Sequence, residues 1–312
     1  MSERYLFPQD YMADPSVHVF GDRLYIYPSH DYDSGAAEDD DGGHFQMRDY
    51  HVLSLCGDPL TAPVIDHGRV LDVDDVPWAA RQMWDNDVVE QGGTYHMIFP
   101  AKDRNGLFRL GMAEGPTPTG PFTPLPDPIR GAYSIDPCLF KDDDGSIYVY
   151  FGGLWGGQLQ RFADNQLLPC EHLPQGSEPA LPARVARMTA DVRQLAEAPR
   201  PVIVVDDKGQ PLTADNPHRF FEASWMHKQA GRYVFSYSTG DTHLLCYAVG
   251  DNPYGPFTYR GVLLEPVSGW TTHHSIVQYQ GRWWLFHHDC QPSHGTTWLR
   301  SLKVKPLIIL DV

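Results

Sequence analysis

The segment Asp136-Pro137-Cys138-Leu139-Phe140-Lys141 is followed by the turn Asp142-Asp143-Asp144-Gly145 and by Ser146-Ile147-Tyr148-Val149-Tyr150-Phe151. Two runs of aromatic and β-branched residues around an Asp-Gly turn predict a β-hairpin, because Asp-Gly adopts the positive φ angles of tight hairpin turns. Four other segments repeat this pattern of strand, Gly-containing turn and aromatic-rich strand: residues 14–27, 85–99, 222–237 and 273–286. Five such hairpins in one chain indicate a repeat architecture.

The intervals between the hairpins leave room for two more strands in each unit. Matching outer segments, Gly120-Pro121-Phe122 and Gly255-Pro256-Phe257, support units of four strands. Five four-stranded units predict an all-β fold, a five-bladed β-propeller, that occupies residues 1–312 as a single domain. The alternative is a β-sandwich whose hairpins resemble one another by chance. Residues 180–198, rich in Ala, Arg and Leu, are expected to form either a short helix or an irregular insertion.

The composition limits the partners of this chain. Its 312 residues are 42% hydrophobic, enough for a sizeable core, and they include 40 acidic against 24 basic residues, a net charge of −16. Such a surface repels the phosphates of nucleic acids and anionic membranes, so we expect neither as a partner. No segment approaches the ~20 apolar residues of a transmembrane helix. Neutral and cationic ligands stay open, and so does assembly into a homo-oligomer.

The cysteines indicate the compartment. They are odd in number and far apart, and none forms a CxxC pair: Cys56, Cys138, Cys170, Cys246 and Cys290. This pattern favours free thiols in a reducing environment over a disulfide framework or a structural zinc site. The N-terminal residues lack the basic head and apolar run of a signal peptide. We therefore expect a cytoplasmic protein.

The first strands of four hairpins can be aligned residue by residue. Asp14, Asp136, Glu222 and His273 occupy the equivalent position near the start of the strand. The innermost strands of a propeller line its central channel, so these side chains should converge near one mouth of that channel. A single Asp before Pro is usually a turn residue, but three carboxylates in one register would cost stability there without a function. Paired carboxylates are the groups that hydrolyse glycosides.

Several motifs surround the aligned residues and their neighbours: Ala13-Asp14-Pro15-Ser16, Met83-Trp84-Asp85-Asn86-Asp87, Tyr133-Ser134-Ile135-Asp136-Pro137, Phe221-Glu222-Ala223-Ser224 and His273-His274-Ser275-Ile276. Together they resemble glycoside hydrolase family 43 along nearly the whole chain. The combination most resembles the single-domain β-xylosidase and α-L-arabinofuranosidase branch. Many relatives have Trp-Ala-Pro-Asp where this chain has Trp84-Asp85-Asn86-Asp87, a difference that bears on the shape of the sugar pocket and not on the chemistry.

The resemblance implies an inverting glycosidase in which each carboxylate has its own role. Asp14 would be the general base that activates water, and Glu222 the general acid that protonates the leaving oxygen. Asp136 would raise the pKa of Glu222 by charge repulsion and orient it. Arg300 resembles the family's sugar-binding arginine, and Trp84 would form a wall of the sugar subsite. A surface salt bridge for Arg300 and a core position for Trp84 are the structural alternatives.

The resemblance also implies a metal. In many family members a histidine at the position of His273 coordinates a calcium ion in the central channel, with waters completing the shell, so Ca²⁺ or another divalent cation is expected here. Calcium prefers oxygen ligands, and a purely structural, hydrogen-bonded histidine is the alternative. His274 is the competing ligand, but strand alternation points it away if His273 faces the channel.

The expected function is exo-acting release of xylose from the non-reducing ends of β-1,4-xylo-oligosaccharides, with side activity on α-L-arabinofuranosides. The partner would then be a xylo-oligosaccharide or arabinoside substrate. An α-L-arabinofuranosidase or arabinanase as main activity is the alternative with the same chemistry. A fructan-active enzyme and a non-catalytic carbohydrate-binding propeller are the alternatives from other classes; a pure binder would not need Asp14, Asp136 and Glu222.

Overall fold

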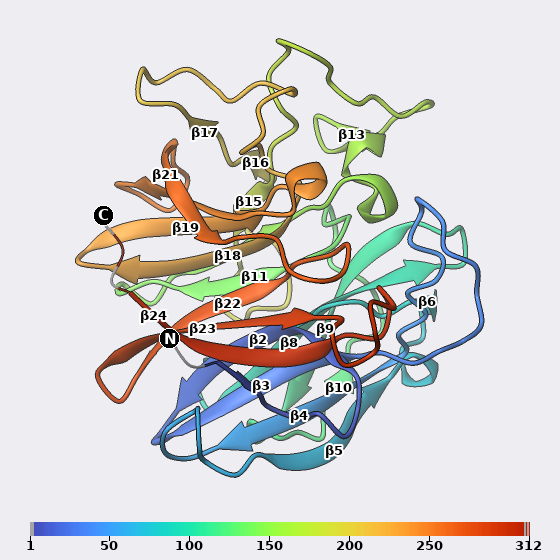
Figure 1. The fold of residues 1–312 in the computed structure, drawn as a ribbon. Helices are drawn as coiled ribbons and strands as arrows, with labels where there is room; N and C mark the ends of the chain where they lie inside the picture. Colours follow the sequence, from blue (N-terminus) through green and yellow to red (C-terminus); the bar gives the residue numbers. More distant parts are fainter. Residues whose placement is uncertain (1–2, 309, 311) are drawn as a thin grey trace.

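The computed structural model describes residues 3–308, 310 and 312, and it consists mainly of five antiparallel sheets, or blades, packed around a common centre (Figure 1). From the inside outward, blade 1 comprises β2 (Met12–Phe20), β3 (Arg23–His30), β4 (Asp49–Leu55) and β5 (Ile65–Asp72). Blade 2 comprises β7 (Asp87–Gln91), β8 (Thr94–Asp103), β9 (Phe108–Gly115) and β10 (Thr123–Pro124). Blade 3 comprises β11 (Cys138–Lys141), β12 (Ile147–Phe151), β15 (Arg184–Arg187) and β16 (Arg200–Pro201).

Blades 4 and 5 comprise β18 (Glu222–Gln229), β19 (Arg232–Ser238), β20 (Leu245–Gly250) and β21 (Phe257–Leu264), and β22 (His274–Tyr279), β23 (Arg282–Asp289), β24 (Ser301–Leu307) and β1 (Arg4–Tyr5). Two short strands extend this frame: β6 (Ala79–Arg81) pairs with β8, and β17 (Val204–Val205) runs parallel to β21. A separate small hairpin is formed by β13 (Phe162–Ala163) and β14 (Gln166–Leu167).

The five inner strands form a closed ring. β2 contacts β7, β7 contacts β11, β11 contacts β18, β18 contacts β22, and β22 returns to β2. A sandwich of two sheets has no such cyclic order, so the predicted five-bladed propeller is confirmed. Each predicted hairpin corresponds to the first two strands of one blade.

The segment at residues 180–198 is not a helix. It contains β15, which pairs with β12 as the third strand of blade 3, and a turn closed by a bridge between Met188 and Leu195. Val185 and Ala186 of β15 are completely buried. The blade needs a third strand at this point, and that requirement outweighs the helical preference of Ala, Arg and Leu.

Both ends of the described chain build blade 5. β1 pairs antiparallel with β24, with Arg4 opposite Val304 and Tyr5 opposite Lys303. The Tyr5 hydroxyl donates to Asp289 Oδ1 at 2.8 Å. The last blade is therefore closed by a strand from the start of the chain.

The cores lie between neighbouring blades. Tyr50 of blade 1 packs with Phe99 of blade 2, and Ile26 of blade 1 belongs to a cluster with Trp284 of blade 5. Asp87 joins three blades, because its carboxylate accepts from the Ser16 hydroxyl of blade 1 and from the Leu139 N–H of blade 3. These contacts hold the inner strands in the register that positions the channel mouth.

Two further expectations concern cysteines and membranes. In the described part of the chain all five cysteines are free, three of them buried, while Cys56 and Cys170 are exposed. Among the described residues, no helix has the length and hydropathy needed to cross a lipid bilayer.

Candidate active site

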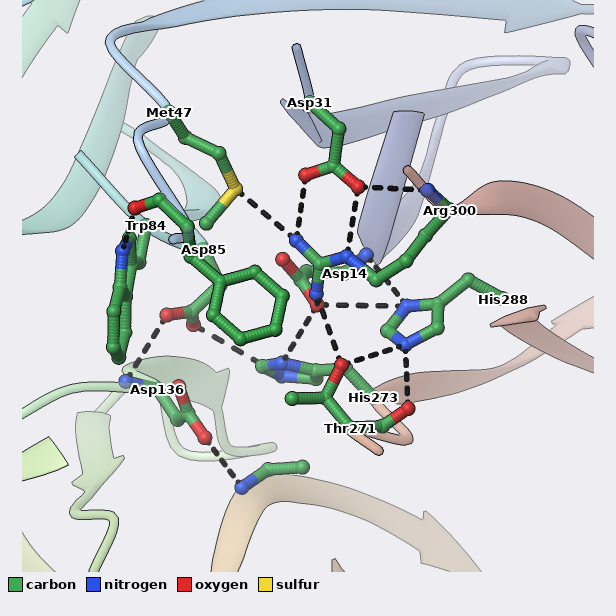
Figure 2. Close-up of polar contacts among 12 residues, drawn as sticks. Asp14, Asp31, Met47, Trp84, Asp85, Asp136, Thr271, His273, His288 and Arg300 are labelled. Atoms are coloured by element: carbon green, nitrogen blue, oxygen red, sulfur yellow. Dashed lines mark hydrogen bonds and ion pairs between the residues drawn. The ribbon is translucent and has the colours of Figure 1, made fainter. Parts of the chain in front are cut away.

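A cavity of about 570 Å³ opens at one mouth of the central channel. All six residues predicted from the sequence line it: Asp14, Trp84, Asp136, Glu222, His273 and Arg300. They come from all five blades, mostly from positions just before or at the start of the inner strands. Figure 2 shows how the polar groups on the floor of this cavity face one another.

Local backbone irregularities aim the carboxylates into the cavity. Asp14 has a φ of 47° and lies in a β-bulge between Ala13 and Ser16. Asp136 has a φ of 56°, just before β11 begins. Asp is one of the residues that tolerate this left-handed region. A bulge turns a side chain away from the ladder, and such irregularities are common next to active sites.

Glu222 starts β18 at a second bulge, which extends from Glu222 to Trp225. Here the residue with positive φ is the next one, Ala223, at 60°. A bulge therefore positions the carboxylate in blade 4 as well. Glu222 comes one residue before the residue of positive φ, whereas in blades 1 and 3 the aspartate itself has the positive φ.

Asp14 is held ionised by a buried arginine. Arg300 Nη1 donates to Asp14 Oδ1 at 2.7 Å, and both residues are almost fully buried. Burial would raise the pKa of Asp14, but the positive charge of Arg300 outweighs this effect, and the pKa is lowered to about 2. Asp14 is therefore a carboxylate throughout the physiological pH range.

His288 lies beside Asp14 and is uncharged. Burial lowers the pKa of His288 to about 3. The Asp14 N–H donates to His288 Nδ1 at 3.0 Å, so the ring proton is on Nε2, which faces the Thr271 carbonyl at 3.0 Å. The approach of His288 Nδ1 to Asp14 Oδ1, 3.4 Å, is thus a contact and not an ion pair.

Glu222 has the opposite protonation preference. Burial of its carboxyl raises the pKa of Glu222 well above its usual range, and the negative charges of Asp136 and then Asp14 add to this shift. Asp136 is itself fixed in place, because its Oδ2 accepts from the Ala223 N–H at 2.6 Å, next to Glu222 in the chain. One cavity therefore holds one carboxyl group whose pKa is lowered and another whose pKa is raised, and such a divergence separates the roles of base and acid.

Asp85 is a site residue that the sequence analysis does not single out. Its Oδ1 accepts from the Asp136 N–H at 3.1 Å, and its Oδ2 lies 3.9 Å from His273 Nε2. Burial and the charge of Asp136 raise its pKa well above the usual range. Asp85 opens the second predicted hairpin, so extending the register alignment to that hairpin would have identified it.

Arg300 is anchored by a second carboxylate. Its Nε and Nη2 donate to the two oxygens of Asp31 at 2.8 and 2.7 Å, and its backbone N–H donates to Asp31 Oδ2 at 2.9 Å. Nη2 also contacts Met47 Sδ at 3.1 Å, and Nη1 reaches the Thr271 hydroxyl at 3.2 Å. The guanidinium thus has few N–H groups left for a sugar, and Met47 Sδ, a weak acceptor, is the partner most easily displaced.

Aromatic side chains shape the walls. Trp84 is 8% exposed, donates from Nε1 to the Phe45 carbonyl at 2.9 Å and packs on Phe108 with 4.6 Å between ring centroids. It is thus both a cavity wall and part of a small core. Trp155 and Trp270, which the sequence analysis does not identify, stack at 5.4 Å and also line the cavity.

Three side chains could hold a cation. Asp85, Asp136 and His273 each offer one ligand atom, and these atoms lie within 4.8 Å of one another. Two buried carboxylates with raised pKa values are a donor set that a divalent cation would stabilise in its ionised form. His274 faces away from them, with Nε2 2.6 Å from Ser236 Oγ, as strand alternation predicts. The donor set fits the expected channel metal.

Comparison with known proteins places this arrangement in context. Residues 8–309 match the sequence profile of glycosyl hydrolases family 43. The chain is 68% identical to a β-xylosidase of Xylanibacter ruminicola, over 98% of this chain and 96% of that protein. It is 61% identical to a xylosidase/arabinosidase of Bacteroides ovatus, over 97% and 93% of the two chains.

A solved structure resembles the fold over almost its full length. It is that of a β-xylosidase/α-arabinofuranosidase from a compost microbial metagenome, in complex with xylotriose and in a calcium-free form. The two chains are 51% identical, the match covers 99% of this chain and 94% of the other, and the TM-score is 0.96.

Proposed function

The chain belongs to glycosyl hydrolases family 43 and is a glycosidase, and on this basis we propose that it releases xylose from the non-reducing ends of β-1,4-xylo-oligosaccharides with inversion of configuration. The observation that carries the proposal is the pairing in one cavity of Asp14, whose pKa is lowered beside Arg300, with Glu222, whose pKa is raised by burial and by the negative charge of Asp136. An inverting glycosidase needs this pair, one group to accept a proton and the other to donate one.

The reaction follows from these protonation states. Asp14 accepts a proton from a water molecule as the water oxygen forms a bond to the anomeric carbon. Glu222 donates its proton to the glycosidic oxygen as the bond from that oxygen to the anomeric carbon breaks. The turnover leaves Asp14 protonated and Glu222 ionised, and proton exchange with solvent restores both. For water to fit between them, the two carboxyl groups should be ~6.5–9.5 Å apart.

The other predicted residues have supporting roles in this proposal. Asp136 keeps Glu222 protonated through its negative charge and is held next to it by the Ala223 N–H. Arg300 keeps Asp14 ionised and fixes its orientation. Trp84 offers an apolar face to the C–H groups of the sugar ring.

We include a divalent cation, Ca²⁺ or a similar ion, in the proposal. Asp85, Asp136 and His273 would hold it, with waters completing the shell. Bound there, its positive charge would offset the negative charges that gather around the floor of the cavity. The calcium-free form of the metagenomic relative suggests that such an ion can be removed from related enzymes.

A second activity on α-L-arabinofuranosides belongs to the proposal because the Bacteroides ovatus relative is a xylosidase/arabinosidase. We also propose a cytoplasmic location, where imported oligosaccharides would be the substrates. The exposed free thiols of Cys56 and Cys170 support a reducing compartment, and cell fractionation would test it.

The decisive experiment is hydrolysis of xylobiose followed by proton NMR, beside an assay with an aryl α-L-arabinofuranoside. Early appearance of α-xylose from the β-linked disaccharide would support xylosidase action and inversion together. Cleavage of the arabinofuranoside alone would make arabinose release the main activity. Early β-xylose would overturn the inverting mechanism, and a Glu222→Gln variant serves as the matched control for contaminating activity.

A further inference from the structure

Blade 1 carries a second cluster of metal-binding side chains. His30 ends β3, and Asp49 and His51 lie on the adjacent strand β4. One ligand atom from each of these three residues lies within 4.8 Å of the others. The two imidazole rings are 4.7 Å apart between centroids. None of the three lines the active-site cavity.

The strand register brings these side chains to one face of the sheet. Ser29 of β3 pairs with Tyr50 of β4, and both residues are completely buried. Because successive side chains of a strand point to opposite faces, His30, Asp49 and His51 lie on the other face, away from the buried pair. Each of the three is partly exposed, so a metal and waters can reach them.

Carboxylates surround both imidazoles. His30 Nδ1 lies 2.6 Å from Asp49 Oδ1, and His30 Nε2 lies 3.3 Å from Asp10 Oδ2. His51 Nδ1 lies 3.1 Å from Asp66 Oδ1. A ligating histidine in a metal site usually has its second ring nitrogen bonded to a carboxylate, which fixes the ring and raises its basicity. Asp10 and Asp66 occupy these outer positions.

We propose that His30, Asp49 and His51 form a binding site for a transition-metal dication of the Zn²⁺ type, separate from the active site. His30 Nδ1, the Asp49 carboxylate and His51 Nε2 supply the ligands, and water completes the coordination. The metal takes the place of the proton between His30 and Asp49, and that proton passes to solvent. Asp10 and Asp66 hold the outer nitrogens of the two imidazoles.

The donor set decides which metals fit. Two imidazoles with one carboxylate suit Zn²⁺, Ni²⁺, Cu²⁺ and Co²⁺, whereas Ca²⁺ and Mg²⁺ prefer sites made of oxygen atoms alone. The cluster also carries three carboxylates and no lysine or arginine in ion-pair contact among the described residues. Its net charge therefore favours a dication.

The test is calorimetric titration of chelator-treated protein with Zn²⁺. The background should be the Cys56→Ser/Cys170→Ser double variant, because the exposed thiols would also bind zinc. We expect zinc binding at this cluster, besides any zinc taken up by the channel group, and the affinity of the cluster should fall at least 10-fold in His51→Gln and in Asp49→Asn. Asp66→Asn should weaken binding by about 10- to 100-fold, as loss of an outer carboxylate does.

Two controls make the result specific. His67→Gln changes a blade 1 histidine that bonds to Ser54 outside the cluster, and His273→Gln changes the channel group; neither should alter the zinc affinity of this site. Thermal melting of each variant shows whether it is folded. Unchanged zinc affinity in both folded His51→Gln and Asp49→Asn, or no zinc binding by the background protein, would overturn the proposal.

Discussion

Arg300 donates to Asp14 at 2.7 Å inside a cavity wall where both side chains are almost fully buried. A buried carboxylate on its own would take up a proton, and this contact prevents it. The same guanidinium is locked by Asp31, so the position of the proposed base depends on two residues from different blades. Breaking such a buried network on one side leaves a charge unpaired, which costs both geometry and stability.

Arg300→Lys tests whether the guanidinium must bind Asp14 and Asp31 at the same time. Lysine keeps one positive charge but cannot bind Asp14 and Asp31 simultaneously in a planar arrangement. We expect kcat/KM for xylobiose to fall about 100-fold or more, because displacement of the base by about 1 Å has that effect. Arg48→Lys, at an exposed pair with Asp74, is the matched control. Equal kcat/KM values for the two variants would show that simultaneous binding of Asp14 and Asp31 by the guanidinium is not needed.

The pH profile of kcat/KM reports the two protonation states. Asp14, with a pKa of about 2, keeps the acid limb at low pH, and loss of the Glu222 proton sets the alkaline limb. Because the negative charge of Asp136 raises the pKa of Glu222, Asp136→Asn should move the alkaline limb to lower pH. Asp143→Asn, on the surface, should leave it in place. An alkaline limb that stays fixed in Asp136→Asn would contradict the assigned coupling.

Replacement of Glu222 separates acid catalysis from binding. In Glu222→Gln we expect the hydrolysis of xylobiose to slow by about 100- to 10,000-fold, the usual contribution of a general acid. An aryl xyloside with a strongly acidic phenol needs no protonation and should lose far less. Steady-state rates on the two substrates give the comparison. Near-normal turnover of xylobiose would remove Glu222 from the role of acid.

The proposed channel cation predicts a dependence on chelation. Exhaustive treatment with a chelator should lower kcat/KM, and added Ca²⁺ should restore it. Removal of the cation would leave the negative charges of Asp85 and Asp136 without a compensating positive charge. His273→Gln should reduce both the activity and the response to chelator. If chelation leaves the rate of the wild-type enzyme unchanged, the metal has no part in the mechanism.

Lys102 is a buried lysine, and we expect its burial to reduce the stability of the fold. Its side chain is 6% exposed and lies 5.0 Å from the Phe108 ring, with no carboxylate in ion-pair contact among the described residues. Burial, then the charge of Arg81, lowers its pKa from 10.5 to about 8. Lys102→Met should raise the free energy of unfolding at pH 7 by about 1–2 kcal/mol.

The expected gain in stability from Lys102→Met becomes smaller as the pH rises. The unfolded chain binds a proton at Lys102 more tightly than the native protein, so the penalty is fully present below pH 8 and disappears as the pH rises toward 10.5. Urea denaturation at pH 7 and pH 10 would therefore show a smaller difference between variant and wild type at the higher pH. Lys208→Met, at an exposed turn, is the control. A destabilised Lys102→Met at pH 7 would refute the assignment.

The repeat explains what the sequence could predict. The alignment places Asp14, Asp136, Glu222 and His273 near the start of inner strands, and a closed ring brings these positions to one mouth, so their convergence in one cavity follows from the sequence even though Glu222 is shifted by one residue in the structure. Asp31 and Arg300 are 269 residues apart, and their pairing depends on how two loops meet, for which the local pattern holds no signal. β1 has two residues and no periodicity, so its place in blade 5 could not be predicted either.

The pairing of β1 with β24 also constrains how the protein is made. Blade 5 combines β1, which precedes the strands of the other blades, with β22 to β24, which follow them, so blades 1 and 5 cannot pack together until the strands of all five blades have been synthesised. Until then the faces of blade 1 that pack on β22 and β23 have no partner. A nascent chain interrupted before β22 would carry this apolar surface uncovered, and uncovered apolar surface makes folding intermediates prone to aggregation.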